Sequence, residues 1–206
     1  MAQAVAQHYI TEDEYWEHEE RSDIKHEYFN GEIFAMAGAS TPHNVLSFNA
    51  GSILGNQLRG TSCRPFGSDQ RLKIEATGLQ VYPDIAVYCR PWRADPKHKD
   101  TLLNPTVLLE VLSPSTAAYD QGEKFDHYKQ LPSLCDYLLV WQDRVRVDCY
   151  RRLENGDWLL HTASTPEESI ALESINCALP LSELYEDVEL PDAPRPLRTT
   201  SPETEQ

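Results

Sequence analysis

Two acidic residues stand in segments of the sequence that otherwise read as buried strands. Asp84 follows a Tyr-Pro pair and precedes the apolar run 85–88, whereas Glu110 lies inside the apolar run 107–112. A carboxylate in a buried strand is costly to desolvate unless a partner compensates its charge. Two such carboxylates, with lysines nearby, suggest a hard divalent cation between them. We therefore expect a hydrolytic metal site that uses Mg²⁺, with Mn²⁺ as the alternative ion.

A purely structural interpretation is also open for both carboxylates. Asp84 could cap a turn, and Glu110 could form an ion pair with Arg71 or Lys73. A buried ion pair seldom adds much stability, because desolvation of the two charges offsets their attraction. We therefore favour metal ligation over pairing.

Lys124 is the third candidate for chemistry. Helical spacing places Asp120, Lys124 and Tyr128 on one face, since they are four residues apart. Beside two carboxylates and a metal, the lysine amine can orient an attacking water or stabilise charge that develops on a phosphoryl group. The alternative is a solvated helix lysine without a catalytic role.

Other polar residues give weaker signals. No HxH or HExxH spacing links the histidines, so we interpret them as structural. One loop contains Trp92 and several basic side chains, which makes it the best candidate for contacts with phosphate. A solvated loop is the alternative. The basic residues of this loop are Arg90, Arg93, Lys97 and Lys99.

The segments that must position these residues are a mixture of helices and strands. A capping box at Thr11 predicts a helix to about residue 20, and Asn30-Gly31 predicts a hairpin between 26–29 and 32–36. Apolar spacing predicts a helix over 43–59, which Gly60 ends. The box Asp120-Gln121-Gly122-Glu123 predicts a second long helix, over 120–131. Strands are expected at 63–66, 70–75, 84–89, 106–112, 136–141, 145–152 and 158–163, and a short helix at 181–185. This mixture indicates an α/β or α+β fold with a mixed sheet.

Length and composition fit one soluble domain. The chain has 206 residues, of which 40% are hydrophobic and 25% charged. We expect a single domain over 1–190 and a disordered Pro-rich tail over 191–206. No apolar run is long enough to span a bilayer, and the N-terminus lacks a secretion signal, so a cytoplasmic location without membrane contact is expected. Five cysteines without a CxxC pair favour reduced structural thiols over disulfides.

The charge balance restricts how nucleic acid could bind. The formal net charge is -15, and most of the excess acid lies in the C-terminal part of the chain. No long basic stripe is present, so strong sequence-independent binding to phosphate is not expected. This counts against a nuclease without excluding one, because a metal or a local basic rim could hold the substrate.

Several motifs together resemble one known family. Tyr82-Pro83-Asp84, the string from Glu110 to Thr116, and the later Asp120-xx-Glu123-Lys124-xxx-Tyr128 are similar to the Uma-type putative restriction endonuclease family. That family is a branch of the PD-(D/E)XK nuclease superfamily. The segment His26-Glu27-Tyr28-xx-Gly31-Glu32 resembles its N-terminal motif. The resemblance implies a restriction-endonuclease-like core, in which helices flank a mixed central sheet, preceded by a helix and a β-hairpin.

The resemblance also implies roles for individual residues. Asp84 would be the motif's aspartate and a metal ligand, Glu110 the second acidic ligand, and the Val111 carbonyl a third oxygen. The sequence has leucine at position 112, where the superfamily has lysine. The resemblance implies that Lys124 takes over that function. Glu27 would be an additional catalytic carboxylate, with an exposed hairpin glutamate as the alternative.

Our leading hypothesis is a Mg²⁺-dependent endonuclease that hydrolyses phosphodiester bonds of DNA. The alternative is a catalytically degenerate nuclease fold that acts as a nucleic-acid-binding or assembly module, which the missing lysine and the acidic composition motivate. Hydrolysis of RNA or of a small acidic substrate fits the same metal site. A homodimer is compatible with the residues, which do not require it.

Overall fold

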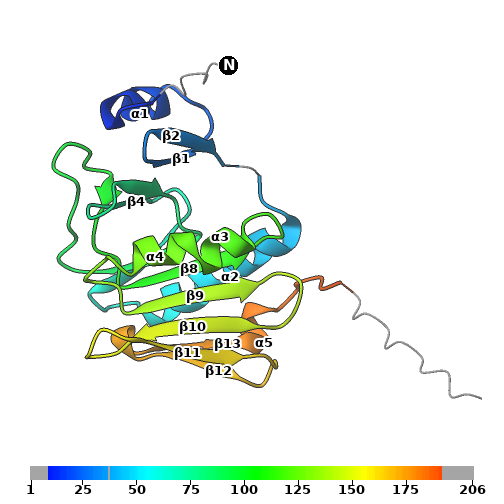
Figure 1. The fold of residues 1–206 in the computed structure, drawn as a ribbon. Coiled ribbons are helices and arrows are strands. Elements are labelled where there is room, and N and C mark those ends of the chain that lie inside the picture. Colours follow the sequence, from blue (N-terminus) through cyan, green and yellow to red (C-terminus); the bar gives the residue numbers. More distant parts are fainter. Residues whose placement is uncertain (1–8, 37, 192–206) are drawn as a thin grey trace, which may run out of the picture.

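A six-stranded mixed sheet forms the centre of the structure, a computed structural model that describes residues 9–36 and 38–191 (Figure 1). The strand order is β11-β10-β9-β8-β6-β3. Only β8 and β9 run parallel, and every other neighbouring pair is antiparallel. The strands are β3 (Cys63–Gly67), β6 (Ile85–Cys89), β8 (Val107–Leu112), β9 (Asp136–Trp141), β10 (Val147–Arg152) and β11 (Trp158–Ala163).

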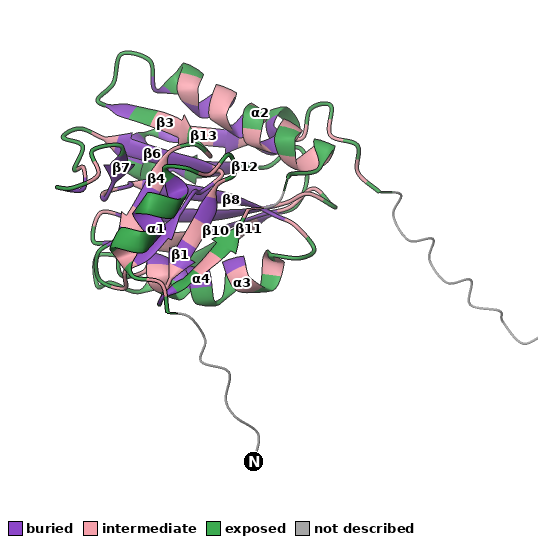
Figure 2. Cartoon of the chain, turned by 90° about the horizontal axis from the view of Figure 1, so that it is seen from above, coloured by how far each residue is buried: buried purple, intermediate pink, exposed green. Residues whose placement is uncertain are grey.

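Helices cover both faces of this sheet (Figure 1). The long helix α2 (Thr41–Gln57) lies on one face, while the short helices α3 (Ala117–Gln121) and α4 (Glu123–Tyr128) lie on the other. Strand β8 is buried along its whole length, as Figure 2 shows, because it is covered from both sides. Side chains alternate along it, so Leu109 packs in the core on the α2 side and Leu108 in the core on the α4 side.

A second sheet extends the core on the α4 side. Its order is β2-β1-β5-β4-β7, and the Asn30-Gly31 turn joins its first two strands, as the sequence predicts. Leu72 and Leu79 of this sheet pack in the same apolar cluster as Phe125 of α4. Helix α1 (Glu12–Glu19) begins at the predicted capping box at Thr11. The strands are β1 (His26–Phe29), β2 (Glu32–Ala35), β4 (Arg71–Ile74), β5 (Leu79–Val81) and β7 (Thr101–Leu102).

A small hairpin that follows β11 packs on the α2 side of the central sheet. Its strands are β12 (Ser169–Leu172) and β13 (Cys177–Pro180), followed by helix α5 (Leu181–Leu184). A short 3-10 turn (Glu173–Ile175) separates the two strands. Leu172 and Leu179 share the apolar cluster of Leu46 and Leu54 from α2. The hairpin therefore completes the apolar core on the α2 side of the sheet.

The structure confirms the mixed α+β fold class and corrects one predicted helix. The chain does not form a single helix over 120–131 with a capping box at Asp120. Instead α3 and α4 meet at Gly122, and Asp120 lies buried inside α3. The capping-box pattern predicts the wrong helix start because the Asp120 side chain contacts Lys124 and does not cap a helix. The short strands β5, β7, β12 and β13 are not predicted from the sequence, because each has too few residues to show a clear alternation of apolar and polar side chains.

The cysteine prediction is also corrected. Cys63 and Cys89 form a disulfide, while Cys135, Cys149 and Cys177 are free thiols. The two bonded residues face each other in the antiparallel register of β3 and β6, with their Cα atoms 3.9 Å apart. Register between strands distant in sequence cannot be read from cysteine spacing.

No helix among residues 9–36 and 38–191 is long and apolar enough to cross a membrane. Apart from Pro191, the predicted tail over 191–206 lies outside the described residues. The single domain over 1–190 stays a prediction.

Candidate active site

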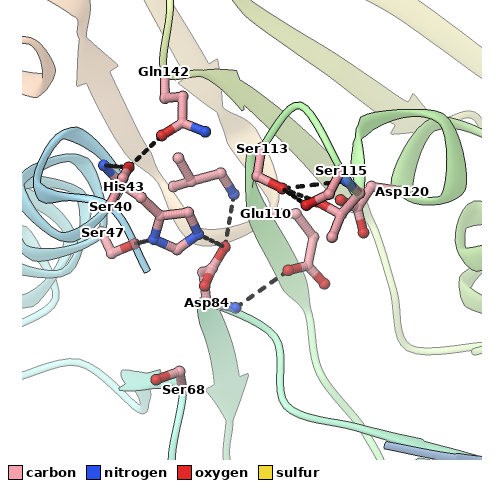
Figure 3. Close-up of polar contacts among 12 residues, drawn as sticks. Ser40, His43, Ser47, Ser68, Asp84, Glu110, Ser113, Ser115, Asp120 and Gln142 are labelled. Atoms are coloured by element: carbon pink, nitrogen blue, oxygen red, sulfur yellow. Dashed lines mark hydrogen bonds and ion pairs between the residues drawn. The ribbon is translucent and has the colours of Figure 1, made fainter. Parts of the chain in front are cut away.

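The site lies where two central strands separate. The pairing of β6 with β8 ends at Ile85 and Leu109. Asp84 and Glu110 would form the next pair, but Pro83 precedes Asp84 and cannot donate a ladder hydrogen bond. Side chains instead bridge the point beyond Ile85 and Leu109 where the two strands separate, which we call the fork. The Asp84 backbone N–H donates to Glu110 Oε2 over 3.3 Å, and the Val111 N–H donates to Asp84 Oδ2 over 2.8 Å (Figure 3).

Helix α2 brings a histidine against the same aspartate. His43 Nε2 lies 3.2 Å from Asp84 Oδ2, and both side chains are about 15% exposed. Helix α2 packs against β6 here, and the Ile85 side chain lies 3.2 Å from the position that a Cβ on Gly51 would occupy. Burial opposes a charge on the ring, yet the hydrogen bond to Asp84 and the nearby negative charges raise the pKa of His43. No sequence pattern predicts this contact, since His43 and Asp84 lie on elements far apart in the chain.

Glu110 is a deeply buried acid of the site. Tyr128 donates its hydroxyl to Oε1 over 2.6 Å, and Lys124 Nζ lies 2.9 Å from the same oxygen. Burial raises the pKa of Glu110 to about 8; Lys124 opposes that rise, whereas the charges of Asp84 and Asp120 add to it. The site therefore holds more negative charge than its own cation compensates.

Lys124 stands at the centre of the acids. Its amine contacts Glu110, lies 3.3 Å from Glu27 Oε1 and 3.5 Å from Asp120 Oδ1, and is 7% exposed. Burial favours the neutral amine, but the surrounding carboxylates, Glu110 above all, raise the pKa of Lys124 well above its usual value. The amine is therefore a protonated donor held by three carboxylates from three elements.

The structure thus brings together four side chains that the sequence nominated: Asp84, Glu110, Lys124 and Glu27. The fifth predicted site residue, Val111, donates its backbone N–H to Asp84. A residue's N–H and C=O point to the same side of a strand, so the Val111 carbonyl also faces the fork. Asp120 joins the cluster as a further acid. Sequence spacing had placed it beside Lys124 without giving it a role.

The ion pairs that offered a structural explanation for Glu110 do not form. Arg71 contacts Glu19 and Tyr82, whereas Lys73 contacts Glu12 and Asp95. In the candidate phosphate-binding loop, Arg93 pairs with Glu75 and Lys97 with Asp13. These acids compete with any phosphate for the loop's cations.

The donor set fits a hard divalent cation. Each principal carboxylate has one oxygen engaged by two donors, while the other oxygen is less occupied: Glu110 Oε2 accepts one long hydrogen bond, and Asp84 Oδ1 accepts none from the described residues. Oxygen ligands from carboxylates and a carbonyl are those that Mg²⁺ takes. Within residues 9–36 and 38–191, no three His, Cys, Asp or Glu side chains are already arranged as a metal-binding group. Two carboxylates, the Val111 carbonyl and water would therefore make up the ligands.

A buried network from α1 supports the site. Glu19 accepts hydrogen bonds from the Tyr82 hydroxyl over 2.6 Å and from the His26 backbone N–H over 3.1 Å. Tyr82 is two residues before Asp84, and His26 directly precedes Glu27. Glu19 therefore fixes the two segments that deliver these acids to the fork.

This network predicts a pH-dependent stability. Burial alone would raise the pKa of Glu19, but Tyr82, His26 and Arg71 lower it below 4.5. The stabilisation is then complete above that value and is lost as pH falls through the lower, folded-state pKa. We expect Glu19→Gln to cost about 1–3 kcal/mol in urea unfolding at neutral pH and little in strong acid. The exposed Glu20→Gln is the control, and a cost independent of pH would contradict the explanation.

Comparison with known proteins identifies a family for the chain. The family model Uma2, described as "Putative restriction endonuclease", matches residues 12–182. Two proteins of Synechocystis sp., both described as uncharacterized, are similar in sequence. The first is 38% identical over 176 residues, covering 85% of this chain and 91% of the relative. The second is 36% identical over 151 residues, covering 73% of this chain and 85% of the relative.

A solved structure confirms the fold. The crystal structure of a putative nuclease belonging to DUF820 from Anabaena variabilis superimposes with a TM-score of 0.71 at 18% identity. The match covers 86% of this chain and 98% of that chain. At this identity the likeness shows the fold alone, which is the restriction-endonuclease-like core that the motifs implied. The extent of the family match and the two sequence relatives show that the chain belongs to the Uma2 family of putative restriction endonucleases.

Proposed function

We propose that this protein is a Mg²⁺-dependent endonuclease that hydrolyses phosphodiester bonds of DNA. The observation that carries the proposal is the forked pair of strands. There, Asp84 and Glu110 approach each other, one oxygen of each is left less occupied, and a buried protonated lysine lies beside them. Family membership supports a nuclease. Mn²⁺ is the alternative ion, because it takes the same oxygen ligands.

Each residue has a task that follows from its position. Asp84, Glu110 and the Val111 carbonyl would hold the ion. When bound, the ion supplies charge neutralisation and a lowered pKa for water. Lys124 would exchange one of its three carboxylate contacts for a phosphate oxygen or the attacking water, and would thereby stabilise charge as it develops. Glu27 completes the acidic cluster and accepts a hydrogen bond from water. Cutting both strands of a duplex would use two copies of the site, so we propose a twofold homodimer.

Nicking of a supercoiled plasmid tests the proposal. Wild-type protein should relax the plasmid with Mg²⁺ and should lose that activity with a chelator, because the carboxylates alone cannot activate water. Asp84→Ala should be inactive, whereas Asp69→Ala, which removes a 98% exposed carboxylate in a turn, should behave as wild type. Equal nicking by wild type and Asp84→Ala would identify a contaminant and remove the assignment.

A non-catalytic module is the second candidate. Leucine at position 112 and the pairing of Arg93 and Lys97 with acids favour it, because both weaken the machinery expected of a nuclease. The same preparation distinguishes the two functions. Retention of DNA in a mobility shift, with no nicking under any divalent ion, would favour the module. Parallel assays with RNA distinguish the nucleic-acid class.

A further inference from the structure

His43 contacts the acidic cluster, yet the proposed cleavage reaction uses none of its atoms. The ring lies in the first turn of α2, whose start is fixed by Ser40. The Ser40 hydroxyl accepts the His43 backbone N–H over 3.2 Å and donates to Gln142 Oε1 over 2.6 Å. On the far side of the ring, Ser47 Oγ lies 3.5 Å from Nδ1 (Figure 3). The helix start and this neighbour hold the ring in one orientation, with Nε2 directed at Asp84.

The consequence for Asp84 follows from counting lone pairs. An ionised carboxylate oxygen accepts about two hydrogen bonds. Asp84 Oδ2 receives both the Val111 N–H, over 2.8 Å, and His43 Nε2, over 3.2 Å. That oxygen is therefore fully engaged. The other oxygen, Oδ1, accepts no hydrogen bond from the described residues, so it is the one left to bind a cation.

We propose that His43 is a positioning residue that restricts Asp84 to one-oxygen coordination and thereby makes the site select Mg²⁺ over Ca²⁺. The proposal rests on the metal site proposed above. Mg²⁺ requires near-ideal octahedral geometry with short bonds, and a fixed single oxygen suits it. Ca²⁺ is larger, tolerates irregular geometry and takes carboxylates through one or two oxygens. Without His43, only the Val111 N–H holds Oδ2, so that oxygen regains a lone pair that it can offer to a larger cation.

Calorimetric titration of the full chain with MgCl₂ and with CaCl₂ tests this selectivity. His43→Ala should weaken Mg²⁺ binding by about 10- to 100-fold, as the loss of a partner to a metal ligand typically does. Its affinity for Ca²⁺ should hardly change, so the preference for Mg²⁺ should fall by a similar factor. His43→Gln should restore the preference, since a glutamine amide reaches about as far as Nε2. His43→Asn should not restore it, because its amide is too short.

The possible results separate the two proposals. An equal loss of Mg²⁺ and Ca²⁺ affinity in His43→Ala, without rescue by glutamine, would mean that His43 only supports the helix and would overturn the inference. Unchanged affinities would overturn it as well. A wild-type chain that binds neither ion would overturn both this inference and the metal-dependent function. Selective loss in a protein that nicks no plasmid would support the role of His43 and remove the endonuclease assignment. His161→Ala, exposed on β11, controls for histidine removal.

Discussion

Glu110→Gln and Asp84→Asn should each lower the rate of plasmid cleavage by about 1000-fold at saturating DNA. Each amide keeps the shape of the side chain and one acceptor oxygen but lacks the charge that a divalent cation requires. Loss of a metal ligand forfeits several kcal/mol of transition-state stabilisation, and about 4 kcal/mol corresponds to three powers of ten in rate. Single-turnover cleavage with excess Mg²⁺ measures the effect without a contribution from product release.

The same substitutions should leave the fold intact. Burial raises the pKa of Glu110 to about 8, so the folded protein without an ion favours the neutral form of this side chain, and a neutral amide replaces that form at little cost. In Glu110→Gln, Tyr128 still has an acceptor, and Lys124 still has Glu27 and Asp120 beside it. We expect unchanged or higher thermal stability together with lost cleavage, which is the trade-off typical of active-site residues. Cleavage within tenfold of wild type would contradict a ligand role for the substituted residue.

Lys124→Met should abolish cleavage and also destabilise the protein strongly. The amine is the cation that Glu110, Glu27 and Asp120 share, and it is almost fully buried. Removing one partner of a buried ion pair costs about 3–5 kcal/mol, because the remaining charges are left uncompensated. Urea unfolding at neutral pH measures this loss. Lys129→Met, which removes a partly exposed lysine paired with Asp126, is the matched control and should cost far less.

Two further measurements separate the electrostatic cause from simple loss of packing. Addition of Glu110→Gln to Lys124→Met should recover part of the lost stability, since the double variant removes both a positive and a negative charge. Millimolar Mg²⁺ should raise the thermal midpoint of Lys124→Met, because an ion that binds only the folded state stabilises it by mass action. An unfolding free energy like that of wild type would show that the amine does not balance these acids.

The sequence alone determined the features that depend on local pattern. An acid within an apolar run marks a buried polar site wherever the run lies, so Asp84 and Glu110 could be found without the fold. Helical spacing placed Lys124 beside Asp120, and that contact forms even though Gly122 divides the expected helix. The Asn30-Gly31 turn and the capping box at Thr11 were likewise predicted correctly, because each depends on residues only a few positions apart.

Tertiary packing determines which distant residues meet at the fork. His43 reaches Asp84 only because α2 packs on β6, and Glu27 reaches Lys124 only because the second sheet lies over α4. The Cys63–Cys89 bond likewise depends on the register of two strands. Such contacts depend on crossing distances and registers set by the whole core, to which each residue contributes little. Periodicity shows which face of an element is buried, but it does not show what that face will touch.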